Sequence, residues 1–142
     1  MQNALVFKKR YVLLIILLLV VGFGAYLIAT FSPVGQKVIK KEKVSNLVNL
    51  YVTEVNAGAT TAFSYRFYLF DASKSDEAFI KSLSGESSPF LITSDRDALK
   101  NIQNRSIYIS VKGEIYLFHS SPGIKINNFI YSFPVYLTSK PF

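Results

Sequence analysis

An uncharged and strongly apolar stretch at positions 11–31 constrains this chain more than any other feature of its sequence. The stretch has the sequence YVLLIILLLVVGFGAYLIATF and contains no Asp, Glu, Lys or Arg. Because a helix rises ~1.5 Å per residue, a helix of this length crosses the ~30 Å hydrocarbon core of a bilayer. We therefore expect residues 11–31 to form a single transmembrane helix.

The chain has a formal net charge of +7 and a pI near 9.6, and most of the excess charge lies beside the apolar stretch. The flanking basic residues are Lys8, Lys9 and Arg10 before the stretch, and Lys37, Lys40, Lys41 and Lys43 after it. At a bilayer surface each such residue is attracted to anionic lipid headgroups by ~1 kcal/mol. Residues 44–142 are nearly neutral and carry no basic stripe, so the sequence favours a lipid partner and argues against nucleic acid.

The basic triplet directly before the stretch predicts the orientation, because positive flanks stay in the cytoplasm. We expect residues 1–10 to be a cytoplasmic N-terminus, 11–31 a signal-anchor helix of the bacterial inner membrane, 32–43 a basic juxtamembrane linker and 44–142 a periplasmic β-rich domain. The lysines beyond the stretch oppose this orientation but lie farther from it. A cleaved signal peptide ending before Ala25 is the alternative, and the apolar run that continues to position 31 argues against cleavage.

Small residues recur on one side of the expected membrane helix. Gly22, Ala25 and Ala29 have helical spacing, and such faces allow two helices to approach closely. This pattern makes a homodimer through the membrane helix a candidate. The simpler interpretation is that small residues are common in membrane helices.

The distal domain is expected to be a small α+β fold, with an antiparallel sheet of five or six strands and one short helix. Residues 44–55 and 60–70 have the composition of strands, and the second is apolar on both faces, as a central strand would be. Ser75 followed by two acids predicts a short capped helix. Residues 90–93 form a further expected strand and residues 94–104 a turn or helical loop. The chain contains no cysteine, so the fold must depend on its core.

The C-terminal part predicts a hairpin followed by an edge strand. In residues 107–119, a three-residue loop at 111–113 would place Ile109 opposite Ile115 and Ile107 opposite Leu117. In the last strand, residues 129–138, Pro134 lacks a backbone donor, which indicates a sheet edge or a bulge. The residues of this strand that we expect to face outward and to bind a partner at the edge are Ser132, Pro134, Tyr136 and Thr138.

The residues that could carry chemistry are few. His119 is the only histidine, and its neighbour Ser120 would point to the opposite face of a strand, so a hydrolytic triad is not indicated. Asp95 and Asp97 could form a carboxylate pair, but the acidic residues lack the spacing of calcium loops. We expect no cofactor, no metal site and no catalytic residues.

Two segments resemble uncharacterised families of small exported or membrane-anchored bacterial proteins. These are residues 56–69 (NAGATTAFSYRFYL), in which a Gly-Ala-Thr-Thr turn opens a β-strand, and residues 107–118 (IYISVKGEIYLF). The resemblance implies a bacterial envelope setting and carries no known activity.

These features favour a membrane-anchored, non-enzymatic binding module that engages another envelope protein, as an immunity or assembly factor does. The domain is rich in Tyr and Phe and ends in an expected edge strand, which could accept a strand of the partner. The alternatives are an envelope hydrolase that uses a carboxylate pair, and a structural subunit that oligomerises through its transmembrane helix.

Overall fold

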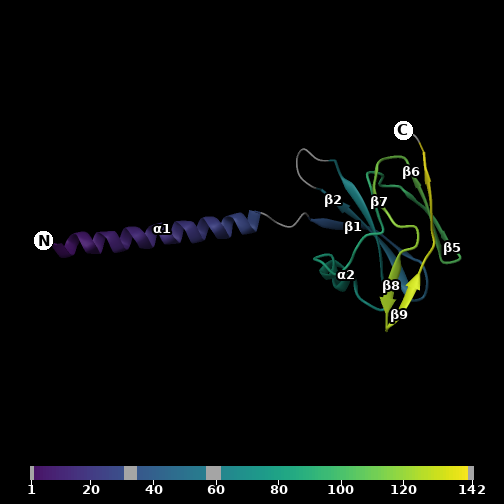
Figure 1. The fold of residues 1–142 in the computed structure, drawn as a ribbon, viewed down its shortest axis with the longest axis horizontal. Coiled ribbons are helices and arrows are strands. Elements are labelled where there is room, and N and C mark those ends of the chain that lie inside the picture. Colours follow the sequence, from purple (N-terminus) through teal and green to yellow (C-terminus); the bar gives the residue numbers. More distant parts are fainter. Residues whose placement is uncertain (1, 31–34, 57–61, 141–142) are drawn as a thin grey trace. The chain divides into compact units, whose positions relative to one another are not determined.

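The computed structural model describes residues 2–30, 35–56 and 62–140, and the chain divides into two compact units, Met1–Pro33 and Val34–Phe142. The first unit contains the helix α1 (Gln2–Thr30). The second unit is a β-rich domain with one short helix, α2 (Figure 1). The small β-rich domain with an antiparallel sheet that the sequence predicts is therefore confirmed.

Helix α1 is a single helix of 29 residues dominated by Leu, Ile and Val, and it includes the basic triplet at positions 8–10. The large apolar side chains between positions 11 and 26 are each more than half exposed. In the described part of the chain, no helix satisfies the length and hydropathy required of a membrane span.

The predicted helix–helix face, Gly22, Ala25 and Ala29, lies within α1, where Gly22 and Ala25 are exposed. Two other predictions fall outside the described residues. They are the end of the expected membrane helix at residues 31–34, and the turn at 57–58 with the rest of the Gly-Ala-Thr-Thr sequence.

The β-rich domain contains ten strands in three sheets over its described residues. They are β1 (Gln36–Lys43), β2 (Val48–Val55), β3 (Ser64–Asp71), β4 (Leu91–Thr93), β5 (Leu99–Gln103), β6 (Ser106–Val111), β7 (Ile115–Phe118), β8 (Gly123–Ile126), β9 (Phe129–Ser132) and β10 (Val135–Ser139). One sheet has the order β1-β2-β3-β4-β7, the second β10-β6-β5, and the third is the β8–β9 hairpin. The pairs are antiparallel except β6 with β10, which run parallel.

The main core, here called the inner core, lies between the five-stranded and the three-stranded sheet. It combines fully buried residues from both, such as Leu50, Phe67 and Leu91 on one side and Ile107 on the other. A second cluster, here called the outer cluster, covers the opposite face of the five-stranded sheet with Tyr51, Tyr68, Phe70 and Phe79. Strand β3 contributes alternate residues to both, which confirms the prediction of a central strand covered on each side.

Helix α2 (Asp76–Ser82) closes the outer cluster. Its N-cap is Ser75, whose hydroxyl accepts a hydrogen bond from the backbone amide of Ala78 at 3.2 Å, as the sequence predicts. Phe79 of α2 stacks on Tyr51 with ring centroids 4.0 Å apart and meets Tyr68 and Phe70 edge to face. The ring contacts fix the helix on the sheet, because aromatic pairs add to the burial of apolar area.

The predicted linker at residues 32–43 is wrong for residues 36–43, which form β1. Because successive side chains of a strand point to opposite faces, Ile39 packs against the inner core and Val38 against the outer cluster, next to a bulge between Val38 and Lys40. The lysines at positions 37, 40, 41 and 43 therefore lie on an edge strand. Lysine is a common means of protecting such an edge from pairing with other chains.

The predicted hairpin at residues 107–119 is also wrong. Strand β6 pairs with β5 and β10, whereas β7 pairs with β4 in the other sheet. The segment between β6 and β7 crosses from one sheet to the other and is fixed by two side chains. The Asp95 carboxylate accepts a hydrogen bond from the amide of Lys112 at 2.8 Å. The Ser94 hydroxyl accepts one from the amide of Glu114, also at 2.8 Å. The expected loop at 94–104 contains β5.

The predicted last strand is divided into β9 and β10. Phe133 is fully buried between them, and its amide donates to the carbonyl of Pro122 at 3.1 Å. In β9, Phe129 is 67% exposed and Ile130 beside it is 77% exposed. The prediction of a sheet edge is confirmed, since β10 is the outer strand of the three-stranded sheet.

Candidate interaction surface

The free side of β10 is the first element of the candidate surface. The amide of Ile107 donates to the carbonyl of Pro134 at 3.0 Å, and the amide of Lys140 donates to that of Val111 at 2.9 Å. In a parallel ladder, alternate residues of a strand direct their N–H and C=O groups to the same neighbouring strand. Because the carbonyl of Pro134 and the amide of Lys140 bond to β6, the backbone groups of Tyr136 and Thr138 also point toward β6, and those of Leu137 and Ser139 point away from it. No strand of the described chain lies on that side of β10. Leu137 and Ser139 therefore present donors and acceptors at an open edge.

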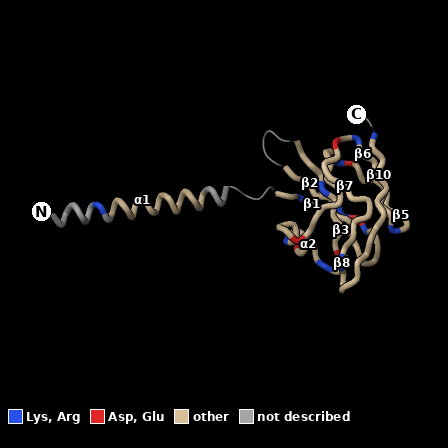
Figure 2. Tube along the Cα trace, in the orientation of Figure 1, with Lys and Arg blue, Asp and Glu red and all other residues tan. Residues whose placement is uncertain are grey.

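The edge strand β1 differs in charge from the edge strands β7 and β10 (Figure 2). Strand β1 carries four lysines and one glutamate, whereas β10 and β7 carry no charged residue. A charged edge strand resists pairing with another chain, and an uncharged one permits it. Strands β10 and β7 are thus the edges suited to a partner.

A pair of exposed aromatic rings lies beside the β10 edge. Tyr108 of β6 and Tyr136 of β10 stand opposite each other in the ladder, and their rings stack with centroids 5.2 Å apart and an interplanar angle of 17°. Tyr136 is 55% exposed and Tyr108 is 40% exposed. Rigid aromatic side chains of this kind are enriched at protein interfaces, because they provide contact area at low entropic cost.

The structure brings together only part of the edge that the sequence predicts. Tyr136 and Thr138 lie in β10 on the same face as Tyr108. Ser132 lies in β9, where its hydroxyl pairs with that of Ser121 at 2.7 Å. Pro134 lies between the two strands, and its carbonyl is used by β6.

Strand β7 supplies residues of this surface that the sequence does not reveal. Phe118 pairs with Leu91 and Ile115 with Thr93, so both side chains lie on the face of the inner core. Nevertheless, Phe118 is 36% exposed and Ile115 is 37% exposed, whereas Leu91 and Thr93 are fully buried. The inner face of β7 is therefore incompletely covered. The sequence does not predict this exposed face, because it predicts that the residues of β7 pair with those of β6.

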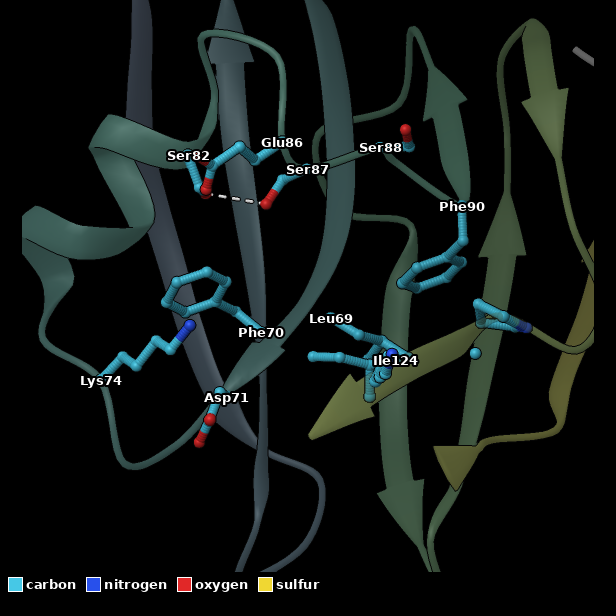
Figure 3. Close-up of a pocket in the computed structure, with 13 residues that line it drawn as sticks. Leu69, Phe70, Asp71, Lys74, Ser82, Glu86, Ser87, Ser88, Phe90 and Ile124 are labelled. Atoms are coloured by element: carbon cyan, nitrogen blue, oxygen red, sulfur yellow. Dashed lines mark hydrogen bonds between the residues drawn. The ribbon is translucent and has the colours of Figure 1, made fainter. Parts of the chain in front are cut away.

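A depression of about 380 Å³ lies near the end of β3 (Figure 3). Three of its polar side chains are engaged: the hydroxyls of Ser82 and Ser87 share a hydrogen bond of 2.7 Å, and the Asp71 carboxylate accepts from the amide and the hydroxyl of Ser73. The Ser73 bonds lower the pKa of Asp71. These contacts stabilise turns.

Of the carboxylate pair considered from the sequence, Asp95 has a structural role. One Asp95 oxygen accepts from the amide of Asp97 at 2.9 Å, and the other accepts from the amide of Lys112. His119 is exposed, and its amide donates to the carbonyl of Phe90 at 2.8 Å. Among the described residues, no group of three or more His, Cys, Asp or Glu is placed to hold a metal ion.

A polar contact connects β1 to α2. One oxygen of Asp76 accepts from the Lys41 ammonium and from the Tyr51 hydroxyl, both at 2.6 Å. These hydrogen bonds lower the pKa of Asp76 and, from the other side, raise the pKa of Lys41. The pKa of Tyr51 is raised, first by burial and then by its bond to Asp76. Lys41, predicted as a membrane flank, thus serves to fix α2.

The comparisons with known proteins give no relative. No family model matches the chain, and neither a curated protein nor a solved structure matches it.

Proposed function

We propose that this chain is a membrane-anchored, non-enzymatic binding module of the bacterial envelope that engages another envelope protein. The observation that carries the proposal is the open, uncharged β10 edge, with the outward backbone groups of Leu137 and Ser139 next to the stacked Tyr108 and Tyr136. Strand addition at such an edge gives affinity through main-chain hydrogen bonds and specificity through neighbouring side chains.

The tether is the uncharged stretch at residues 11–31, with α1 as its helix and the basic triplet at 8–10 on the cytoplasmic side. It is supported by the exposure of the large apolar side chains at positions 11–26. Water-exposed apolar surface of this extent is unfavourable, and lipid tails would remove the cost. The β-rich domain then lies on the periplasmic side, where an immunity or assembly factor would meet its partner.

The tether is tested by washing membranes with alkaline carbonate. The full chain is expected to stay in the membrane pellet, and a reporter fused after Phe142 is expected to be active only in the periplasm. Release of the chain by carbonate would contradict the anchor.

The binding edge is tested with a photo-crosslinking amino acid at Thr138 in the full chain, in membranes of the host. A discrete adduct is expected from Thr138 and not from the matched exposed position Lys100 on β5. Ser139→Pro removes an outward amide that β6 does not use, so it should abolish the adduct, while Ser139→Thr should retain it. Identical adducts from Thr138 and Lys100, or an adduct that survives Ser139→Pro, would overturn the proposal.

A further inference from the structure

We infer that the partner segment is a single extended strand with apolar side chains on one face, which pairs with β10 and covers Ile115 and Phe118 of β7. The inference rests on the proposed function and specifies the partner's chemistry. It follows from three features of the β-rich domain: the positions of the two uncharged edges, the uncovered inner face of β7, and the unequal widths of the two sheets.

The two uncharged edges meet at one end and lie on the same side of the domain. The amide of Val135, at the start of β10, donates to the carbonyl of Ser120 at 2.8 Å, and Ser120 follows β7 by two residues. Strand β10 then continues from this junction as the border of the smaller sheet, while β7 is the border of the larger one. A strand added to β10 would therefore extend the smaller sheet over β7.

The residues that such a strand would cover are already directed toward it. Ile115 and Phe118 share the inner-core face with Thr93 and Leu91, yet more than a third of each side chain is exposed. On β10, the side chain of Leu137 packs against the inner core, and its backbone amide and carbonyl are directed to the free side. The free side of β10 at Leu137 thus offers backbone hydrogen-bonding groups next to apolar side chains that are only partly buried.

The width of the sheets favours a single foreign strand over a second copy of this chain. The larger sheet has five strands, which face the three of the smaller sheet and the β8–β9 hairpin, and its border strand β7 is incompletely covered. If two copies paired β10 with β10 about a two-fold axis, each would bring its own β7 into the space beneath the other's β10. The two β7 strands would then compete for the same place, whereas one added strand has no such neighbour.

The chemistry of the occupant follows from its surroundings. Neither β7 nor β10 carries a charge, and the side facing Ile115 and Phe118 must become buried. Burying a charge there without a partner is costly, so the inward side chains of the added strand must be apolar. Its outward side chains lie beside Tyr136 and Thr138 and tolerate polar residues.

The test uses the full chain in detergent, extended after Phe142 by a Gly/Ser linker and a strand of the length of β10. One extension alternates Thr with Val, and the matched control alternates Thr with Asp. Because the chain has no cysteine, a single thiol introduced by Ile115→Cys reports access to the inner face of β7. Phe129→Cys, in the separate β8–β9 hairpin, serves as the reference thiol.

The Thr/Val extension is expected to raise the thermal midpoint by several degrees and to slow the labelling of Ile115→Cys several-fold, with Phe129→Cys unchanged. The Thr/Asp extension should do neither. Equal effects of both extensions, or no protection by either, would overturn the inference. If the chain without an extension forms a dimer, and Ser139→Pro dissociates that dimer, the inference is overturned and the occupant of the β10 edge is a second copy of this chain. Loss of the Thr138 adduct in membranes, by contrast, would overturn the proposed function itself.

Discussion

Phe118 stands directly opposite Leu91 on the same face of the larger sheet, yet Leu91 is fully buried and Phe118 is 36% exposed. The difference arises within one pair of neighbouring strands. Strand β4 lies between β3 and β7, whereas β7 is the border of the larger sheet. The two residues therefore make different contributions to stability, although their positions in the ladder are equivalent.

Leu91→Ala is expected to lower the free energy of unfolding by about 2–5 kcal/mol, because it leaves a cavity in the inner core. Phe118→Ala removes more atoms but is expected to cost only about 1 kcal/mol, since its side chain is partly hydrated already. Urea denaturation of both variants measures the difference. Equal losses would show that β7 is as well covered as β4.

The contact of Asp76 with Lys41 and Tyr51 predicts a dependence of stability on pH. The pKa of Asp76 is lowered from its ordinary value of 3.8, so its contribution is present above that value and is lost as the pH falls through the lowered pKa. The pKa of Lys41 is raised from 10.5, so its contribution is lost only as the pH rises above that value.

Asp76→Asn should therefore remove part of the decrease in thermal midpoint below pH ~4, relative to the unmodified chain. Asp71, whose pKa is also lowered, does not depend on Asp76 and titrates in both proteins, so its contribution cancels in the difference between the two curves. Parallel curves in acid would mean that Asp76 does not contribute to the docking of α2.

Gly113 is required because of a close approach. A Cβ atom at position 113 would collide with the hydroxyl of Ser94, which accepts a hydrogen bond from the amide of Glu114 at 2.8 Å. Gly113→Ala is expected to cost about 1–3 kcal/mol, because it displaces Ser94 and leaves that amide without its acceptor. In a Ser94→Ala background the same substitution should cost distinctly less. A double-mutant cycle by chemical denaturation measures this coupling, and additive effects would exclude it.

The β8–β9 hairpin turns at Asn127 and Asn128, which have φ values of 47° and 68°. Two successive residues with positive φ are typical of a type I′ turn. Asn128→Ala should destabilise the domain by about 1 kcal/mol, because Ala adopts this conformation less readily, and Asn128→Gly should not. Thermal unfolding of the two variants compares them, and equal midpoints would contradict this account of the turn.

Features set by local sequence could be predicted. The alternation of Tyr65, Phe67, Tyr68 and Phe70 indicates a strand buried on both faces, and the structure places these residues in the inner core and the outer cluster. Ser75 and the acids after it define the start of α2. Pro134 indicates an edge because it has no amide to donate.

Features set by distant contacts could not be predicted. Residues 107–118 have the pattern of a hairpin, but the side chains of Ser94 and Asp95 direct the chain from one sheet to the other. The lysines of β1 suggest a solvated linker, but they lie on an edge strand that is fixed by its pairing with β2. The exposure of Ile115 and Phe118 depends on the relative width of two sheets, which no local pattern encodes.

The chain reaches the β-rich domain through β1, and the beginning of that strand is fastened. The side-chain oxygen of Gln36 accepts hydrogen bonds from Thr53 and Tyr68, both at 2.9 Å, and β1 runs antiparallel to β2 from there to Lys43. Tension transmitted from the residues before Gln36 along the axis of β1 would load these bonds together in shear rather than one at a time. A domain held at β10 and pulled through β1 would accordingly resist the detachment of β1.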